Sequence, residues 1–148
     1  MSKILKYFLI GILFWFVIDF TTTEAIRNPR HYYSIYMPAL LIFYVGYPLI
    51  FSVLIYKFKV TNRFLFIATL LGIVLIEIFF THNALLYTFP LMILTIPVAV
   101  ALYSLLTFVP KWIVDGEIKN NKWKLTILSI IYVLVSLATL FGNGRLNF

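Results

Sequence analysis

The stretch LLYTFPLMILTIPVAVALYSLLTFV, Leu85–Val109, runs for 25 residues without a charged side chain. A helix needs about 20 apolar residues to cross about 30 Å of hydrocarbon. Four more apolar runs accompany it: Ile4–Ile18, Met37–Tyr56, Phe64–Phe80 and Leu125–Phe141. Because these runs fill most of the 148 residues, the sequence predicts an all-α membrane protein built as a bundle of five transmembrane helices.

Composition supports the membrane assignment. Hydrophobic residues make up 63% of the chain and charged residues 11%, far from the balance of a soluble domain. The segments between the apolar runs are too short to fold separately, so residues 1–148 are expected to form a single domain. The chain has no cysteine, which excludes disulfides, thiolate metal sites and cysteine nucleophiles.

The N-terminal sequence Met1–Lys6, two lysines ahead of an apolar run, resembles the start of a secretory signal. A signal peptide would continue into a small-residue cleavage site, whereas this run leads into Ile18–Glu24, which has no such pattern. We therefore expect the first run to remain as an uncleaved helix.

The basic residues predict how the bundle is oriented. With five helices, nine of the twelve Lys and Arg residues fall on one side: Lys3, Lys6, Lys57, Lys59, Arg63, Lys111, Lys119, Lys122 and Lys124. The other side has Arg27, Arg30 and Arg145. The positive-inside rule then places the N-terminus in the cytoplasm and the C-terminus outside, in a multi-pass protein of the cell membrane. Topology and anionic lipids also explain the net charge of +7, so membrane lipids, and not nucleic acid, are the expected partners.

Small residues predict where the helices pack together. Ala68-x-x-x-Gly72 lies in the third run, Thr95-x-x-x-Ala99 in the fourth, and Ser129 and Ser136 share a face of the fifth. Packing within the chain is the favoured interpretation. Docking of a partner subunit on the last helix is the alternative.

The polar residues near the ends of the runs form the candidate functional cluster. The predicted topology brings them all to the outer side: Asp19, Glu24, Arg27, Arg30, His31, Glu77 and His82. Ionisable groups at membrane depth are costly, so each needs a partner, a water-filled cavity or a place at the interface.

Three chemistries could use this cluster. A metal site would join the histidines to Asp19 and Glu77, but Glu77 and His82 are five residues apart, about 140° around an ideal helix. Proton or cation passage could use either carboxylate, although the sequence reveals no polar path to the inner side. Lipid chemistry could use a carboxylate as acid or base, with Arg27 or Arg30 holding phosphate.

A structural interpretation of the same residues is favoured. Asp19 can cap the following turn or pair with Arg27 or Arg30, and Glu24 lies three residues before Arg27. Glu77 can accept a hydrogen bond from Thr81 one turn later. On this interpretation the cluster caps and pairs polar groups at the ends of the helices and takes part in no reaction.

No nucleotide-binding or nucleophile motif occurs, so we expect no catalytic residues, cofactor or metal. The leading hypothesis is an accessory or scaffolding subunit of a larger membrane complex, with other membrane-protein subunits as partners. The alternative is a small lipid-processing enzyme or transporter that uses the outer Asp/Glu/His cluster. The isoleucine, lysine and phenylalanine bias is compatible with prokaryotic hosts but does not identify a source.

Overall fold

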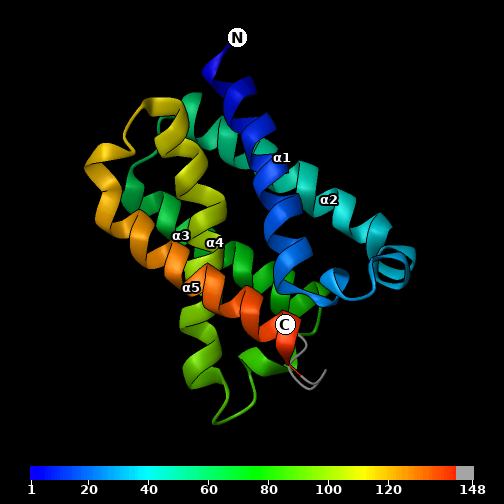
Figure 1. Ribbon diagram of the computed structural model, residues 1–148. Coiled ribbons are helices and arrows are strands. Elements are labelled where there is room, and N and C mark those ends of the chain that lie inside the picture. The colour runs from blue at the N-terminus through cyan, green and yellow to red at the C-terminus, as the bar shows by residue number, and fades with distance from the viewer. Residues whose placement is uncertain (143–148) are drawn as a thin grey trace.

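The computed structural model describes residues 1–142, and these residues form helices without a strand (Figure 1). The long helices are α1 (Lys3–Thr22), α2 (Pro29–Tyr56), α3 (Asn62–Ile73), α4 (Met92–Asp115) and α5 (Lys122–Phe141). A π-helical segment, Val74–Phe80, continues α3. With that segment added to α3, five helices are long and apolar enough to span a membrane, which confirms the predicted class.

Several helix bounds differ from those expected. Helix α2 begins at Pro29, eight residues before Met37, because Pro29 fits a first helical turn and the Asn28 side chain caps the His31 amide. Helix α4 begins at Met92 instead of Leu85, after a short 3-10 turn, Ala84–Leu86. It also continues past Val109 to Asp115, where Gly116 takes a left-handed conformation (φ 72°) and ends it.

The helices run between two chemically different ends. Lys3 Nζ lies 2.9 Å from Asp115 Oδ1 and 5.9 Å from the centre of the Tyr56 ring, so the N-terminus and the ends of α2 and α4 lie together. The basic connections after α2 and α4 start there, and we call this the basic end. At the opposite end, Thr139 of α5 lies beside Thr22 of α1, with Thr139 Oγ1 3.4 Å from the Thr22 carbonyl oxygen.

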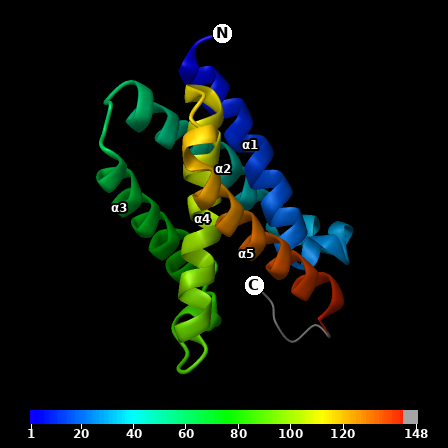
Figure 2. The ribbon, with the colours of Figure 1, turned by 60° about the vertical axis from the view of Figure 1, so that its left-hand side comes forward.

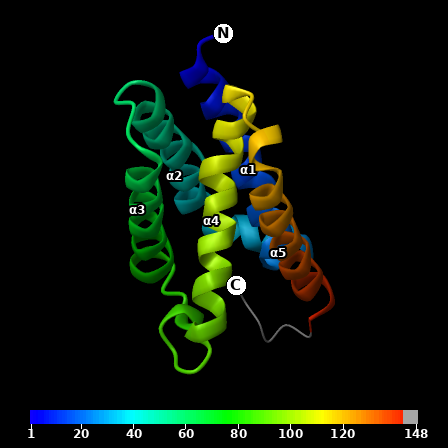
Figure 3. The same ribbon diagram turned by 90° about the vertical axis from the view of Figure 1, so that its left-hand side faces the viewer.

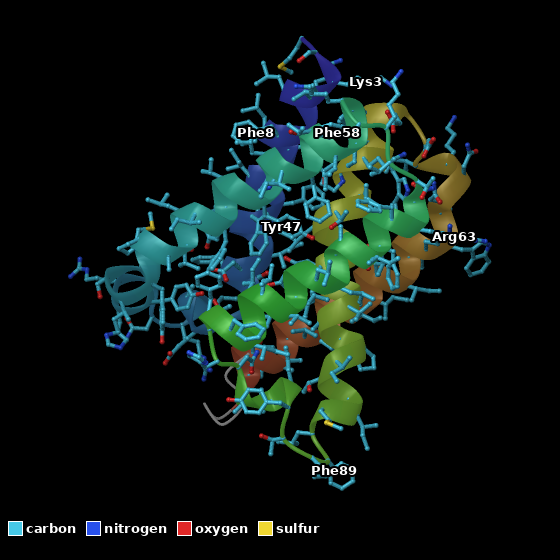
Figure 4. The ribbon with its side chains drawn as sticks, turned by 180° about the vertical axis from the view of Figure 1, so that it is seen from behind. Lys3, Phe8, Tyr47, Phe58, Arg63 and Phe89 are labelled. Atoms are coloured by element: carbon cyan, nitrogen blue, oxygen red, sulfur yellow. The ribbon has the colours of Figure 1, made fainter. Side chains whose placement is uncertain are left out.

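Figure 4 shows the two ends, with Lys3 at the top, Phe89 at the bottom and Tyr47 between them. The segregation of the basic residues agrees with the alternation read from the sequence. Which end faces the cytoplasm stays a prediction, and Arg145 lies outside the described residues.

Helices α1 to α4 provide the buried aromatic core. Trp15 sits among tyrosine rings, with ring centres 6.1, 5.2 and 5.6 Å from those of Tyr44, Tyr47 and Tyr103. At Gly11, an added Cβ would lie 2.7 Å from Pro48 Cβ, so α1 and α2 cross there at close range. Trp112 of α4 is buried in the same core.

Helix α5 is peripheral. It packs on α4 and α1, and only Val135 and Thr139 of it are buried. Figures 2 and 3 show α4 between α3 on one side and α5 on the other. Of the predicted packing residues, Gly72 does meet a neighbouring helix, since a Cβ there would lie 3.0 Å from the Tyr47 ring.

Candidate functional site

A small cavity of about 80 Å³ lies toward the end opposite the basic end, and both Asp19 and Glu77 line it. This volume has room for a few water molecules. Helix α1, the π-helical segment and α4 supply most of its wall, which also includes Trp15, Ile18, Thr22, Thr23, Asn83, Ala99, Leu102, Tyr103 and Leu106. The two carboxylates, 58 positions apart in the sequence, therefore line the same small cavity.

Tyrosines of α2 hold the Asp19 carboxylate. The Tyr32 hydroxyl lies 3.0 Å from Oδ1 and 3.1 Å from Oδ2, and the Tyr44 hydroxyl donates to Oδ2 at 2.5 Å. Hydrogen bonds from hydroxyl groups replace part of the hydration that a carboxylate loses on leaving water. Asp19 therefore joins the last turn of α1 to α2.

Glu77 is placed by the π-helical segment. Such segments are rare and occur frequently at functional sites. Its Oε1 accepts a hydrogen bond from the buried Tyr103 hydroxyl at 2.7 Å, and its Oε2 accepts one from Asn83 Nδ2 at 3.1 Å. Thr81 Oγ1 lies 2.9 Å from the Glu77 carbonyl and 3.4 Å from Oε2, which confirms the bond expected across this turn.

Among residues 1–142, the cavity wall contains two carboxylates and no lysine, arginine or histidine. The nearest arginine in sequence to Asp19, Arg27, donates instead to the Gly142 carbonyl oxygen at 2.9 Å. The expected pairing of Asp19 with Arg27 or Arg30 is therefore wrong for the described residues, because tyrosines occupy that role. A carboxylate pair without a cation at membrane depth is costly unless it takes up a proton or a cation.

Trp15 adds an unsatisfied donor to this region. Its side chain lines the cavity and is 6% exposed. Its Nε1–H has no hydrogen-bond partner among the described residues. Buried polar groups are usually paired with protein or with water, so an ordered water in the cavity would satisfy this one.

The remaining predicted cluster residues do not line the cavity. Glu24, Arg27, Arg30, His31 and His82 are exposed near the same end of the bundle. Their side chains stay outside because they lie in the turn after α1, at the start of α2 and in the connection after the π-helical segment. Among residues 1–142 no group of three or more His, Asp or Glu side chains is placed to hold a metal ion.

A second buried polar network lies deeper in the bundle. Tyr47 Oη and Thr107 Oγ1 are 2.6 Å apart, and Thr69 Oγ1 donates to Thr107 Oγ1 at 3.1 Å. The Tyr7 hydroxyl donates to the Thr107 carbonyl oxygen at 2.9 Å. Tyr103 neighbours this network, because its ring centre lies 6.0 Å from that of Tyr47. We call the five residues Tyr7, Tyr47, Thr69, Tyr103 and Thr107 the hydroxyl ladder.

The hydroxyl ladder places tyrosine and threonine hydroxyls within apolar runs, where the sequence revealed no polar path toward the basic end. The ladder is not one continuous chain of hydrogen bonds, because Tyr103 and Tyr47 share a ring contact and the Tyr7 hydroxyl bonds to a backbone carbonyl oxygen. At the basic end it approaches Tyr56, whose ring centre lies 6.0 Å from that of Tyr7. Sequence reasoning missed Tyr32, Tyr44, Tyr47 and Tyr103 because tyrosine in or beside an apolar run is usually packing or interfacial surface.

Comparison with known proteins gives no further guide to this site. No protein-family model, curated protein or solved structure matches the chain, so the geometry of the residues is what bears on its function.

Proposed function

We propose that this protein is a small proton-binding transporter whose binding group is the Asp19–Glu77 carboxylate pair. One observation carries the proposal: both carboxylates line one small cavity whose wall, as residues 1–142 form it, holds no basic side chain. Proton uptake is then the simplest way to remove excess negative charge from the site. An incoming hydronium transfers its proton to a carboxylate oxygen and leaves as water.

The size of the cavity favours a proton over a larger substrate. Sites for small organic ligands usually enclose about 300–1,000 Å³. The cavity measures about 80 Å³, too small for a lipid head group. The transporter form of the alternative hypothesis therefore agrees with the geometry better than lipid processing does.

The hydroxyl ladder supports a route from the site into the bundle. Tyr103 donates to Glu77, and its ring neighbours that of Tyr47, which is hydrogen-bonded to Thr107. Hydroxyl groups both donate and accept, so such a series can pass a proton where water completes the contacts. With the basic end in the cytoplasm, the carboxylate pair would take up protons from the outer side.

The test is proton flux into liposomes that contain the purified protein and a trapped pH-sensitive dye. Wild-type protein should acidify the lumen under an inward proton gradient. Glu77→Gln and Asp19→Asn should each lower the rate at least about tenfold, which corresponds to about 1.4 kcal/mol on the barrier. Glu24→Gln is the matched control, since Glu24 is an exposed carboxylate outside the cavity.

Equal rates for wild type and Glu77→Gln would overturn the proposal. The accessory-subunit hypothesis stays a prediction. That hypothesis would be favoured if the purified protein showed no proton flux in liposomes and co-purified from native membranes with a stoichiometric partner.

A further inference from the structure

A second and larger cavity, a groove at the basic end, is lined by residues of α3, α4, α5 and the connection between α4 and α5. Figure 3 shows α4 between α3 and α5. It measures about 620 Å³, within the usual range for small-molecule sites. Its wall comprises Asn62, Ser104, Phe108, Trp112, Glu117, Asn120, Asn121, Lys124, Ile127 and Leu128. We infer that this groove binds one anionic phospholipid from the adjacent leaflet.

The inner wall of the groove suits a lipid chain. Ser104, Phe108 and Trp112 lie four residues apart on α4, which aligns them on one face over about 12 Å. The Phe108 and Trp112 ring centres are 6.2 Å apart. Ile127 and Leu128 of α5 provide the facing apolar side.

The rim of the groove suits a phosphate. Asn62, Asn120 and Asn121 bring side-chain amides to it, and Lys124 brings an ammonium group. The one carboxylate of the wall, Glu117, has its Oε2 3.5 Å from Lys111 Nζ, which also contacts Asp115 Oδ2 at 3.0 Å. Lys124 is left as the cation of the wall, which is complementary to one phosphodiester.

The surroundings favour a lipid over a partner helix. Lys119 and Lys122 are exposed beside the rim but do not line the cavity, so they add to the positive charge of this end without facing the head group. A partner helix would have to supply its own acidic residue opposite Lys124. Anionic phospholipids are concentrated in the cytoplasmic leaflet, so mass action favours a lipid in the groove.

The experiment is native mass spectrometry of the full chain, titrated in mild detergent with dioleoyl-phosphatidylglycerol or dioleoyl-phosphatidylcholine. We expect one retained phosphatidylglycerol and weaker retention of phosphatidylcholine. Lys124→Gln should weaken the retained lipid about fivefold, the effect of one basic residue. Lys122→Gln, which removes the same charge outside the cavity wall, should change it less than about twofold.

A second pair of variants tests the groove itself. Ile127→Trp should narrow the groove and lower retention, whereas Ile130→Trp should not, because both isoleucines are exposed on α5 but only Ile127 lines the groove. Equal losses for Lys122→Gln and Lys124→Gln, or full retention by Ile127→Trp, would overturn the inference. So would equal retention of the two lipids. The groove and the carboxylate cavity lie at opposite ends, so either proposal can fail alone.

Discussion

At the scale of single residues, tyrosine hydroxyl groups supply the hydrogen bonds to the two carboxylates that charged side chains would supply in a soluble protein. Tyr32, Tyr44 and Tyr103 donate to the two carboxylates, and their rings pack in the aromatic core. A tyrosine can do both because an apolar body carries one polar tip. Asp19 and Glu77 were recognisable from the sequence as rare membrane carboxylates. Their donors were not, because nothing local says which of ten tyrosines turns inward.

Tyr47→Phe is expected to slow proton flux at least about tenfold while the carboxylate pair still takes up a proton. The change removes the hydroxyl that contacts Thr107 but keeps the ring, and Thr107 still receives a bond from Thr69. Liposome flux measures the first effect. The infrared band of the protonated carboxyl, assigned by its loss in Asp19→Asn or Glu77→Gln, measures the second.

The control for this prediction is Tyr36→Phe, because Tyr36 lies on the same helix and is 49% exposed. Interhelical hydrogen bonds in membrane proteins contribute about 0.6 kcal/mol on average, so the Tyr47 variant should still fold. A parallel fall of the infrared band and the flux would mean that Tyr47 shapes the site and does not relay protons.

At the scale of helices, apolar run length predicted that five spans exist but not where each begins. Helix α2 extends back to Pro29 through the polar residues Arg30 and His31, because a capped helix can continue beyond the hydrocarbon. The π-helical segment could not be predicted from the sequence either. Nothing in its sequence VLIEIFF distinguishes a π-helix from an α-helix, and it is from this segment that Glu77 accepts the hydrogen bond of Tyr103.

Gly11→Ala is expected to destabilise the protein by about 1–3 kcal/mol, because its Cβ would lie 2.7 Å from Pro48 Cβ. Gly46→Ala is the matched control, since nothing lies within 4 Å of a Cβ there and both changes raise helix propensity equally. Thermal unfolding in detergent compares the two. A Gly11→Ala melting temperature at or above that of Gly46→Ala would show that the α1–α2 crossing is looser than described.

At the scale of the whole molecule, charge is segregated between the two ends, and this was readable from the sequence because loop charges need no knowledge of packing. The cavity and the groove were not readable, since each combines residues from three or more distant segments. The natural absence of cysteine makes the orientation directly measurable.

Single cysteines in place of Lys57 and Lys119 should react with an impermeant thiol reagent only from the cytoplasmic side. A cysteine in place of Arg30 should react only from outside. All three positions are exposed, at the basic end for the first two and the opposite end for the third. The reverse pattern would invert the orientation and move the carboxylate pair to the cytoplasmic side.

The peripheral place of α5 also bears on how the protein is made. Every residue of the buried aromatic core comes from the segments up to α4. During synthesis, both carboxylates, their tyrosine donors and the hydroxyl ladder reach the membrane before α5 emerges from the exit tunnel of the ribosome. The first four helices can therefore assemble as a nascent bundle, and α5 then closes one side of a groove that a lipid already in the leaflet can enter first.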